Sequence, residues 1–200
     1  MNRTRSAELV PVIRKAAHRV LAEAGSAGIT IRAVATEANV SPQSLYNRFG
    51  NREALLDDVA TAGYRALSTT MLGHGHRQLA TISDPLLRLT ELFRRYRIVA
   101  LAEPSVHRFL FDEPMPWRSG RTREAAAEPF GLAVAATRMA IDAGLLIPGD
   151  AVDLAGRIWA CAEGTIRLEL ASLDRLPAHP HFEATLATMV RGLRPSAQLR

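Results

Sequence analysis

Three side chains in one short segment, Gln43, Ser44 and Asn47, carry amide and hydroxyl groups that can hydrogen-bond to the edges of DNA bases. An amide matches the donor and acceptor of adenine, and a hydroxyl can bond to several base edges. Asn47 follows the other two by four and three residues, which is the spacing of neighbours on one helix face. The segment therefore predicts a helix that presents hydrogen-bonding groups to a major groove.

Two short helices joined by a tight turn should position these groups. We expect helices over 30–38 and 42–49, capped by Thr30 and Ser41. Asn39 lies between them, and asparagine is the non-glycine residue that best tolerates a left-handed turn. Two helices joined in this way form a helix-turn-helix, whose second helix enters the major groove of DNA.

Arg52 stands in the first turn of the next expected helix, 52–70, which Asn51 should cap. The helix macrodipole disfavours a cation at that position. A phosphate held there would be attracted by the helix N-terminus and by the guanidinium. The alternative is a surface arginine surrounded by solvent, and the residues do not decide between the two.

The pattern from residue 30 to 56 resembles the DNA-binding signature of the TetR family of one-component regulators. The residues that carry the resemblance are Thr30-Ile31-Arg32-x-Val34-Ala35-x-x-Ala38-Asn39-Val40-Ser41-x-x-Ser44-Leu45-Tyr46-Asn47-Arg48-Phe49-x-Asn51-Arg52-x-Ala54-Leu55-Leu56. Residues 13–25 resemble the family's first helix. Asn39 stands where the family usually has glycine and Arg52 where it usually has lysine, and both keep the property that the position needs.

The resemblance implies a homodimer bound to a palindromic double-stranded DNA operator, most often a repressor that a small-molecule effector releases. The DNA contacts that it implies are Thr30, Ser41, Pro42, Gln43, Ser44, Tyr46, Asn47, Arg48 and Arg52. Two of these positions have another interpretation. The Tyr46 ring could serve the core instead, and Arg48 could be a surface ion-pair residue.

Composition agrees with a helical protein that meets a polyanion. The chain has 200 residues, of which 48% are hydrophobic and only 6% aromatic, and its formal net charge is +5. Its longest stretch without a charged residue, 66–76, is about half the roughly 20 residues of a membrane span. Cys161 is the single cysteine. We therefore expect a cytoplasmic protein with no membrane segment, no disulfide and no cofactor.

The remaining pattern predicts an all-α fold of about nine helices. The first helix should cover 11–24, starting at Pro11 or near Ala7, and Gly25 should end it. The later helices should cover 84–102, 104–111, 122–143 with a kink or split at Pro129, 150–173 and 180–193. We expect a DNA-binding domain over 1–50, a connecting helix over 51–70, and an effector-binding and dimerisation domain over 71–200.

The second domain offers candidates for an effector pocket, although aromatic residues at helical spacing more often form core. The candidates are Phe93, Arg97, Phe109, Trp117, Met139, Trp159 and Glu163, with Tyr96 and Phe111 beside them. Trp159, Gly164 and the pair Leu168-Glu169 resemble one TetR C-terminal subgroup. The resemblance also implies a four-helix dimer interface from the last two helices, through Ala155, Ile158, Ala162, Ile166, Leu186, Met189 and Val190.

Other chemistry has weaker support. His74-Gly75-His76 and His179-Pro180-His181 lack the spacing and acidic companions of a metal site, so we expect no metal. We expect no catalytic residues, because no nucleophile-elbow motif or glycine-rich phosphate loop is present. The alternative function is a helical small-molecule-binding protein or enzyme that no longer reads DNA.

Overall fold

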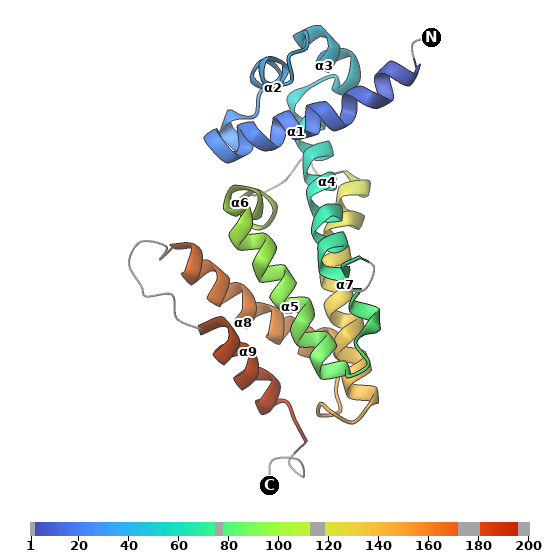
Figure 1. Cartoon of the computed structure of the whole chain (residues 1–200), viewed down its shortest axis with the longest axis vertical. Helices are drawn as coiled ribbons and strands as arrows, with labels where there is room; N and C mark the ends of the chain where they lie inside the picture. Colours follow the sequence, from blue (N-terminus) through green and yellow to red (C-terminus); the bar gives the residue numbers. More distant parts are fainter. Residues whose placement is uncertain (1–2, 75–77, 113–118, 172–180, 196–200) are drawn as a thin grey trace. The chain divides into compact units, whose positions relative to one another are not determined.

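The computed structural model describes residues 3–74, 78–112, 119–171 and 181–195. These residues form nine α-helices and one short 3-10 helix, with no strand among them, which confirms the predicted all-α class (Figure 1). The elements are α1 (Arg3–Gly28), α2 (Ile31–Glu37), α3 (Pro42–Phe49), α4 (Arg52–Leu72), η2 (Leu79–Thr81), α5 (Pro85–Ala102), α6 (Pro104–Phe111), α7 (Gly120–Asp142), α8 (Ala151–Ala171) and α9 (His181–Gly192).

Packing divides the chain into two compact units. Unit 1 comprises Met1–Ala66 and Glu103–Ala126, and unit 2 comprises Leu67–Ala102 and Ala127–Arg200. Helices α4 and α7 each contribute residues to both units. The predicted functional division into a DNA-binding domain (1–50), a connecting helix (51–70) and an effector domain (71–200) stays a prediction.

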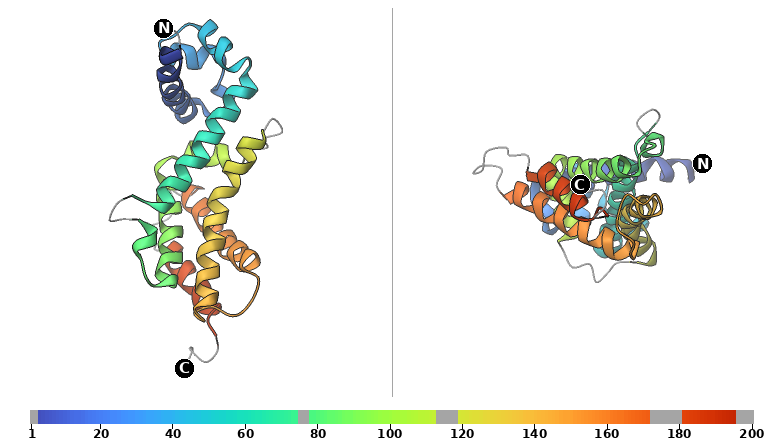
Figure 2. Two further views of the ribbon diagram at one scale, coloured as in Figure 1. Left: turned by 90° about the vertical axis from the view of Figure 1, so that its right-hand side faces the viewer. Right: turned by 90° about the horizontal axis from the view of Figure 1, so that it is seen from below.

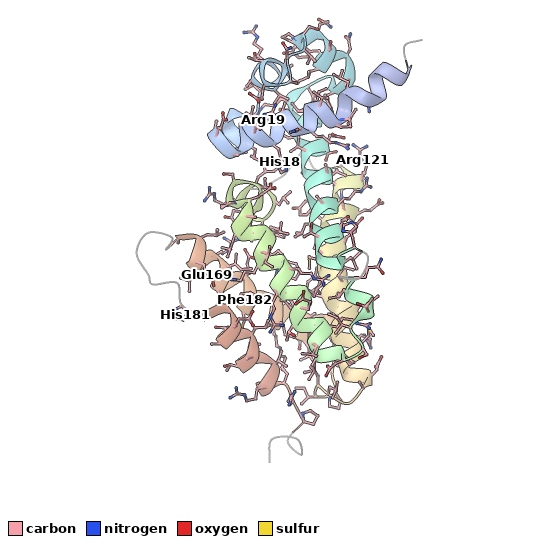
Figure 3. The ribbon with its side chains drawn as sticks, viewed as in Figure 1. His18, Arg19, Arg121, Glu169, His181 and Phe182 are labelled. Atoms are coloured by element: carbon pink, nitrogen blue, oxygen red, sulfur yellow. The ribbon has the colours of Figure 1, made fainter. Side chains whose placement is uncertain are left out.

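Unit 1 is built on one apolar core to which α1, α2, α3, α6 and parts of α4 and α7 contribute. Its fully buried members include Ile13, Leu21, Val34, Ala35, Leu45 and Leu55, with Phe109 at 1% exposure. Alanine at 35 and 38 lets α2 approach its neighbours closely. Arg19 of α1 also forms an ion pair with Glu37 of α2 (Figure 3), and the Tyr64 hydroxyl donates to the Leu110 carbonyl.

Two helices continue through an internal proline, so their extents differ from the predicted ones. Helix α1 begins at Arg3, before either expected start, so Pro11 lies within it. A proline costs an established helix one hydrogen bond and need not end it. Gly25, the expected stop, interrupts α1 with φ 65°, and the last turn continues to Gly28. Helix α7 runs as one helix through Pro129, which is buried, so it does not split there.

Unit 2 packs α5 against α8, and α8 against α9 (Figure 2). The buried face of α5 includes Leu89, Leu92, Phe93 and Tyr96. Among the described residues, no helix is long and apolar enough to cross a membrane.

Most of the apolar residues predicted for the dimer interface face the interior of the single chain instead. Six of the seven are buried within the single chain: Ala155, Ile158, Ala162, Ile166, Leu186 and Val190. The reason is that α8 uses this face against α5 and α9. Its exposed positions include Val152, Ala160, Gly164 and Leu168, with Val152 51% and Leu168 65% exposed.

Candidate nucleic-acid interface

Local hydrogen bonds fix the geometry of α2, the turn and α3. The Thr30 hydroxyl accepts from the Ala33 amide at 3.0 Å, and the Ser41 hydroxyl accepts from the Ser44 amide at 3.2 Å. Asn39 has φ 53°, and it is the one non-glycine residue with positive φ among those described. Both predicted caps and the left-handed turn are confirmed.

Helix α3 is anchored on one side and open on the other. Leu45 is fully buried in the unit 1 core. Pro42, Gln43, Tyr46, Asn47 and Arg48 are exposed, and Ser44 is half-buried. The Tyr46 ring is 47% exposed, so core packing does not account for it.

The polar side chains of α3 hydrogen-bond to one another. The Gln43 Nε2 donates to the Asn47 Oδ1 at 2.8 Å. The hydroxyls of Ser41 and Ser44 lie 2.8 Å apart and also share a hydrogen bond. These contacts place an ordered amide pair on the exposed face, beside a pair of hydroxyls engaged at the cap.

Arg52 has a structural role that neither prediction foresaw. Its Nε donates to the Ile29 carbonyl at 2.6 Å, and its Nη2 donates to the Ser26 carbonyl at 2.8 Å. The guanidinium thus ties the start of α4 to the last turn of α1 and to the connection that follows it. The Asn51 side chain caps α4 as expected, accepting from the Ala54 amide at 2.8 Å. Contact of Arg52 with a phosphate stays a prediction.

A buried polar network in unit 1 was not predicted. The Asp57 carboxylate accepts from the Ser119 amide at 2.7 Å and from the Thr122 hydroxyl at 2.6 Å, and the Arg121 guanidinium lies 3.8 Å away. Burial opposes ionisation of this carboxylate. The hydrogen bonds from Ser119 and Thr122 and the charge of Arg121 outweigh burial, so the pKa of Asp57 lies below its ordinary value.

The neighbouring carboxylate joins the same region to α1. Asp58 accepts two hydrogen bonds from Arg14, at 2.8 and 2.9 Å. The hydrogen bond to Asp58 raises the pKa of the Arg14 guanidinium, although desolvation opposes it. The available sequence signal was the adjacent pair Asp57 and Asp58 directly after the apolar residues Leu55 and Leu56, because buried carboxylates need partners.

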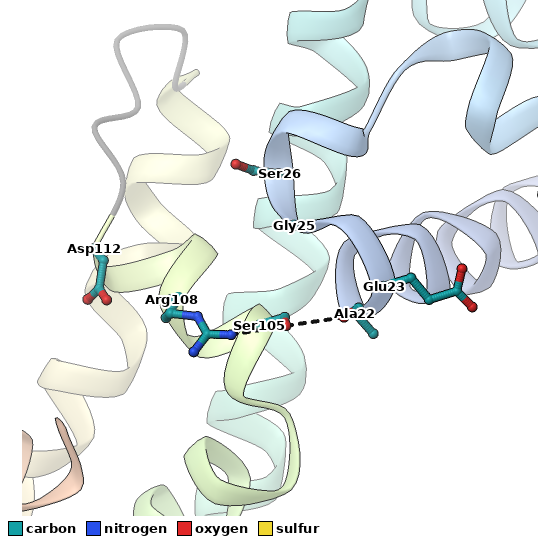
Figure 4. A pocket seen from close by; sticks show the side chains of 7 residues that line it. All are labelled: Ala22, Glu23, Gly25, Ser26, Ser105, Arg108 and Asp112. Atoms are coloured by element: carbon teal, nitrogen blue, oxygen red, sulfur yellow. Dashed lines mark hydrogen bonds between the residues drawn. The ribbon is translucent and has the colours of Figure 1, made fainter. Parts of the chain in front are cut away.

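Helices α1 and α6 meet in unit 1 through polar contacts. His18 Nδ1 lies 3.1 Å from a Glu103 oxygen, and the Ser105 hydroxyl donates to the Ala22 carbonyl at 3.5 Å. A cavity of about 330 Å³ opens beside this contact, with Arg108 and Asp112 of the α6 segment on one side and Gly25 on the other (Figure 4). None of the predicted DNA or pocket residues lines it.

In unit 2, three aromatic rings gather around one tryptophan. Trp159 of α8 contacts Phe93 and Tyr96 of α5, with ring centroids 5.8 and 4.6 Å apart, and Phe130 of α7 at 5.9 Å. Phe130 was not among the predicted residues. The Tyr96 hydroxyl donates to Glu163 at 2.6 Å.

Glu163 and Arg97 are both paired, as charges on largely apolar helices must be. Glu163 also accepts from Arg167 at 2.8 Å. Arg97 forms an ion pair with Glu169 at 2.7 Å, and its guanidinium carbon lies 5.3 Å from the centre of the Phe182 ring (Figure 3).

Two predicted pocket residues, Phe109 and Met139, do not join this aromatic group within unit 2. Phe109 lies in the unit 1 core. Met139 is 39% exposed, and its sulfur lies 3.1 Å from Arg88 Nη1. Trp117 lies outside the described residues. A second cavity, of about 700 Å³, is lined by the end of α4, the turn around η2, and α5, and it includes none of the predicted residues.

The two histidine pairs lie partly outside the described residues, because His76 and His179 are not among them. Within the described part of the chain, no three His, Cys, Asp or Glu side chains are grouped as metal ligands.

Comparisons with known proteins agree along the chain. Residues 13–59 match the family model of bacterial regulatory proteins of the tetR family, and residues 89–193 match that of the tetracyclin repressor-like C-terminal domain. No curated protein matches the sequence.

Solved structures share the fold. A protein with unknown function from Rhodococcus sp. RHA1 is 28% identical with a TM-score of 0.81, over 94% of this chain and 96% of that one. A TetR family transcription regulator from Marinobacter aquaeolei VT8 is 16% identical with a TM-score of 0.72, over 96% and 98%. RolR in complex with resorcinol is 17% identical with a TM-score of 0.66, over 98% and 92%.

Proposed function

Since the chain belongs to the tetR family of bacterial regulatory proteins, we propose that it is a homodimeric repressor that leaves a palindromic operator when a small molecule binds. The observation that carries the proposal is α3. It is capped at Ser41, anchored by the buried Leu45, and exposes the amides of Gln43 and Asn47. A helix held in this way can enter a major groove without losing its own packing.

The proposed DNA contacts fall into two kinds. Pro42, Gln43, Ser44 and Asn47 face the bases, and Tyr46 lies beside them for a phosphate. Thr30, Ser41, Arg48 and Arg52 complete the phosphate set, and their hydroxyl, amide and guanidinium groups fix the register on the duplex. Arginine contacts of this kind make binding weaken as salt rises. We assign DNA binding to residues 1–50, the connecting helix to 51–70, and effector binding and dimerisation to 71–200.

The exposed face of α8 supports the proposed dimer. Every fourth residue from 152 to 168 is small or apolar: Val152, Gly156, Ala160, Gly164 and Leu168. A Cβ placed on Gly156 or Gly164 would meet nothing within 4 Å. This stripe can therefore admit a helix of a second copy at close range. Two copies would place their α3 helices in successive major grooves, roughly 34–36 Å apart.

The effector proposal rests on unit 2. The aromatic group around Trp159 would supply apolar contact, and Glu163 would supply a polar one. Ser68 and Thr137 are also buried in this unit, and their hydroxyls have no hydrogen-bond partner among the described residues. Buried polar groups normally have partners, and an effector could supply them. RolR, which has the same fold, holds resorcinol, which is a small aromatic molecule with two hydroxyls.

We place the C-terminal half in the subgroup suggested by Trp159, Gly164 and Leu168-Glu169. The proposed activity needs no catalytic residue and no cofactor. For an effector to act, it must bind the two states of the dimer with different affinity, typically by about 1–3 kcal/mol.

Selection of bound fragments from sheared genomic DNA tests the proposal. The full chain should enrich one palindromic site, and the Gln43→Ala/Asn47→Ala variant should not. Gln78→Ala removes an exposed amide in unit 2 and should behave like the parent. Equal, salt-sensitive binding of parent and double variant to all fragments would refute DNA reading and favour the alternative, a helical protein that binds only small molecules.

A further inference from the structure

We propose that Gln43 reads one adenine in each operator half-site and that Asn47 is the positioning residue that holds the Gln43 amide in its reading orientation. The inference rests on the proposed function and goes beyond it, because it names the base and separates the roles of the two amides.

The hydrogen bond between Gln43 and Asn47 leaves the Gln43 amide one donor and one acceptor for a base. A glutamine amide has two N–H donors and one carbonyl acceptor. One N–H of Gln43 is donated to the Asn47 Oδ1 at 2.8 Å. The N–H that points away from Oε1 can make this bond, which leaves the other N–H and the Oε1 side by side on an exposed residue. Gln43 can therefore keep its bond to Asn47 while it offers one donor and one acceptor to a base.

Only one base matches that pair of groups in the major groove. Adenine presents the N7 acceptor beside the N6 donor, which a single amide can engage with two hydrogen bonds. Guanine presents two acceptors, so the Oε1 would face another oxygen or nitrogen lone pair. Cytosine presents a donor alone, and thymine an acceptor and a methyl group.

The neighbouring polar groups of α3 are less available for this role. The Ser41 hydroxyl already accepts from the Ser44 amide and shares a hydrogen bond with the Ser44 hydroxyl. Arg48 carries donors only, and Pro42 has no side-chain hydrogen-bonding group. The exposed Tyr46 hydroxyl is a donor and an acceptor on a single oxygen. The Gln43–Asn47 pair instead offers amides, whose donor and acceptor lie side by side on two atoms, as the adenine edge requires.

Asn47 contributes through Gln43. A free glutamine side chain loses rotational freedom when it binds, and this loss weakens the contact. The bond from Gln43 to Asn47, which lie one helical turn apart, restricts the amide before DNA arrives. An acceptor at position 47 is all that this role requires, so aspartate should perform it.

The test compares adenine with 7-deazaadenine at each adenine of the selected operator. The analogue keeps the N6 amino group and the base pair and lacks only the N7 acceptor. The parent should lose about tenfold in affinity at one adenine of each half-site, within the range of a lost bidentate contact. Gln43→Ala should bind both duplexes equally, and Gln43→Glu should shift the preference at that position to cytosine.

The positioning role of Asn47 is tested by the ratio of affinities for the adenine and 7-deazaadenine duplexes. Asn47→Ala should reduce the discrimination at that adenine to below about threefold. Asn47→Asp should restore it, even though the added negative charge lowers affinity for every duplex alike. Far-UV circular dichroism should show that these variants at exposed positions keep their helices.

The outcomes separate the two proposals. If no DNA sequence is selected, the proposed function fails and this inference fails with it. If a site is selected and no adenine analogue changes binding in a way that depends on Gln43, the inference alone is wrong. If the adenine ratio depends on Gln43 and is the same in the parent and Asn47→Ala, the role assigned to Asn47 is overturned.

Discussion

Replacing Asp57 by alanine should lower the free energy of unfolding more than most single substitutions do. The carboxylate is buried and accepts from the Ser119 amide at 2.7 Å and the Thr122 hydroxyl at 2.6 Å. These contacts hold the start of α7 against α4 within unit 1. Alanine would leave the Ser119 amide without its acceptor.

The magnitude follows from those two bonds. A hydrogen bond to a charged group contributes about 1.5–3 kcal/mol. The Thr122 hydroxyl has other partners, the Asp57 carbonyl at 3.1 Å and the Thr61 hydroxyl, so its loss is smaller. Arg121 is 57% exposed and 3.8 Å away and adds at most about 1 kcal/mol. We therefore expect a loss of about 2–4 kcal/mol for Asp57→Ala and about 1 kcal/mol for Asp57→Asn.

Urea unfolding at one fixed protein concentration measures this loss. The midpoint should fall while the slope stays constant. Because the pKa of Asp57 is lowered in the folded state, its stabilising effect is complete above the ordinary aspartate pKa, about 3.9, and is lost as pH falls through the lowered value. The gap between parent and Asp57→Asn should therefore be constant near pH 7 and narrow below about pH 4. A change under about 0.5 kcal/mol in Asp57→Ala would refute the reasoning.

Three further predictions concern single contacts. Asn39→Gly should leave the free energy of unfolding unchanged or raise it by up to about 1 kcal/mol, because Asn39 has φ 53° and glycine adopts a positive φ at no steric cost. A large fall in the melting temperature would contradict this. Arg52→Ala should cost about 1–3 kcal/mol through the bonds to two carbonyls, with Arg52→Lys intermediate in the same urea assay. The pKa of Glu183 is lowered by its bonds to Arg94. The contribution of this exposed ion pair to the free energy of unfolding should therefore fall as the pH drops through the lowered pKa of Glu183. Glu183→Gln should cost about 0–1 kcal/mol, and a cost that persists in 1 M salt would refute an exposed ion pair.

The sequence predicted best what depends on residues close together in the chain. A cap depends on a side chain and an amide about three residues apart, and the predicted caps at Thr30, Ser41 and Asn51 are all present. The left-handed turn at Asn39 is equally local. For the same reason, the sequence could place α3 and its exposed polar residues before any packing was known.

Contacts between distant residues could not be predicted in the same way. Arg52 bonds to carbonyls 23 and 26 residues earlier, and Asp57 bonds to an amide 62 residues later. Phe109 has the same apolar pattern as Phe93, yet it lies in the core of unit 1. Helix α8 is apolar on two faces, so periodicity alone did not indicate which face packs inside the chain.

The discontinuity of unit 1 sets an order of events during synthesis. Residues 1–66 leave the ribosome first, but Phe109, Leu110 and Ala125 of the same core follow only after the whole 67–102 segment has been made. At bacterial rates of elongation, synthesis from residue 67 to Ala125, the last of these core residues, takes roughly 3–12 s. During this interval the nascent residues 1–66 expose an apolar surface of α1 that α6 will later cover. Apolar surface exposed in this way makes a nascent chain prone to aggregation. A chain released before residue 103 would keep that surface exposed permanently.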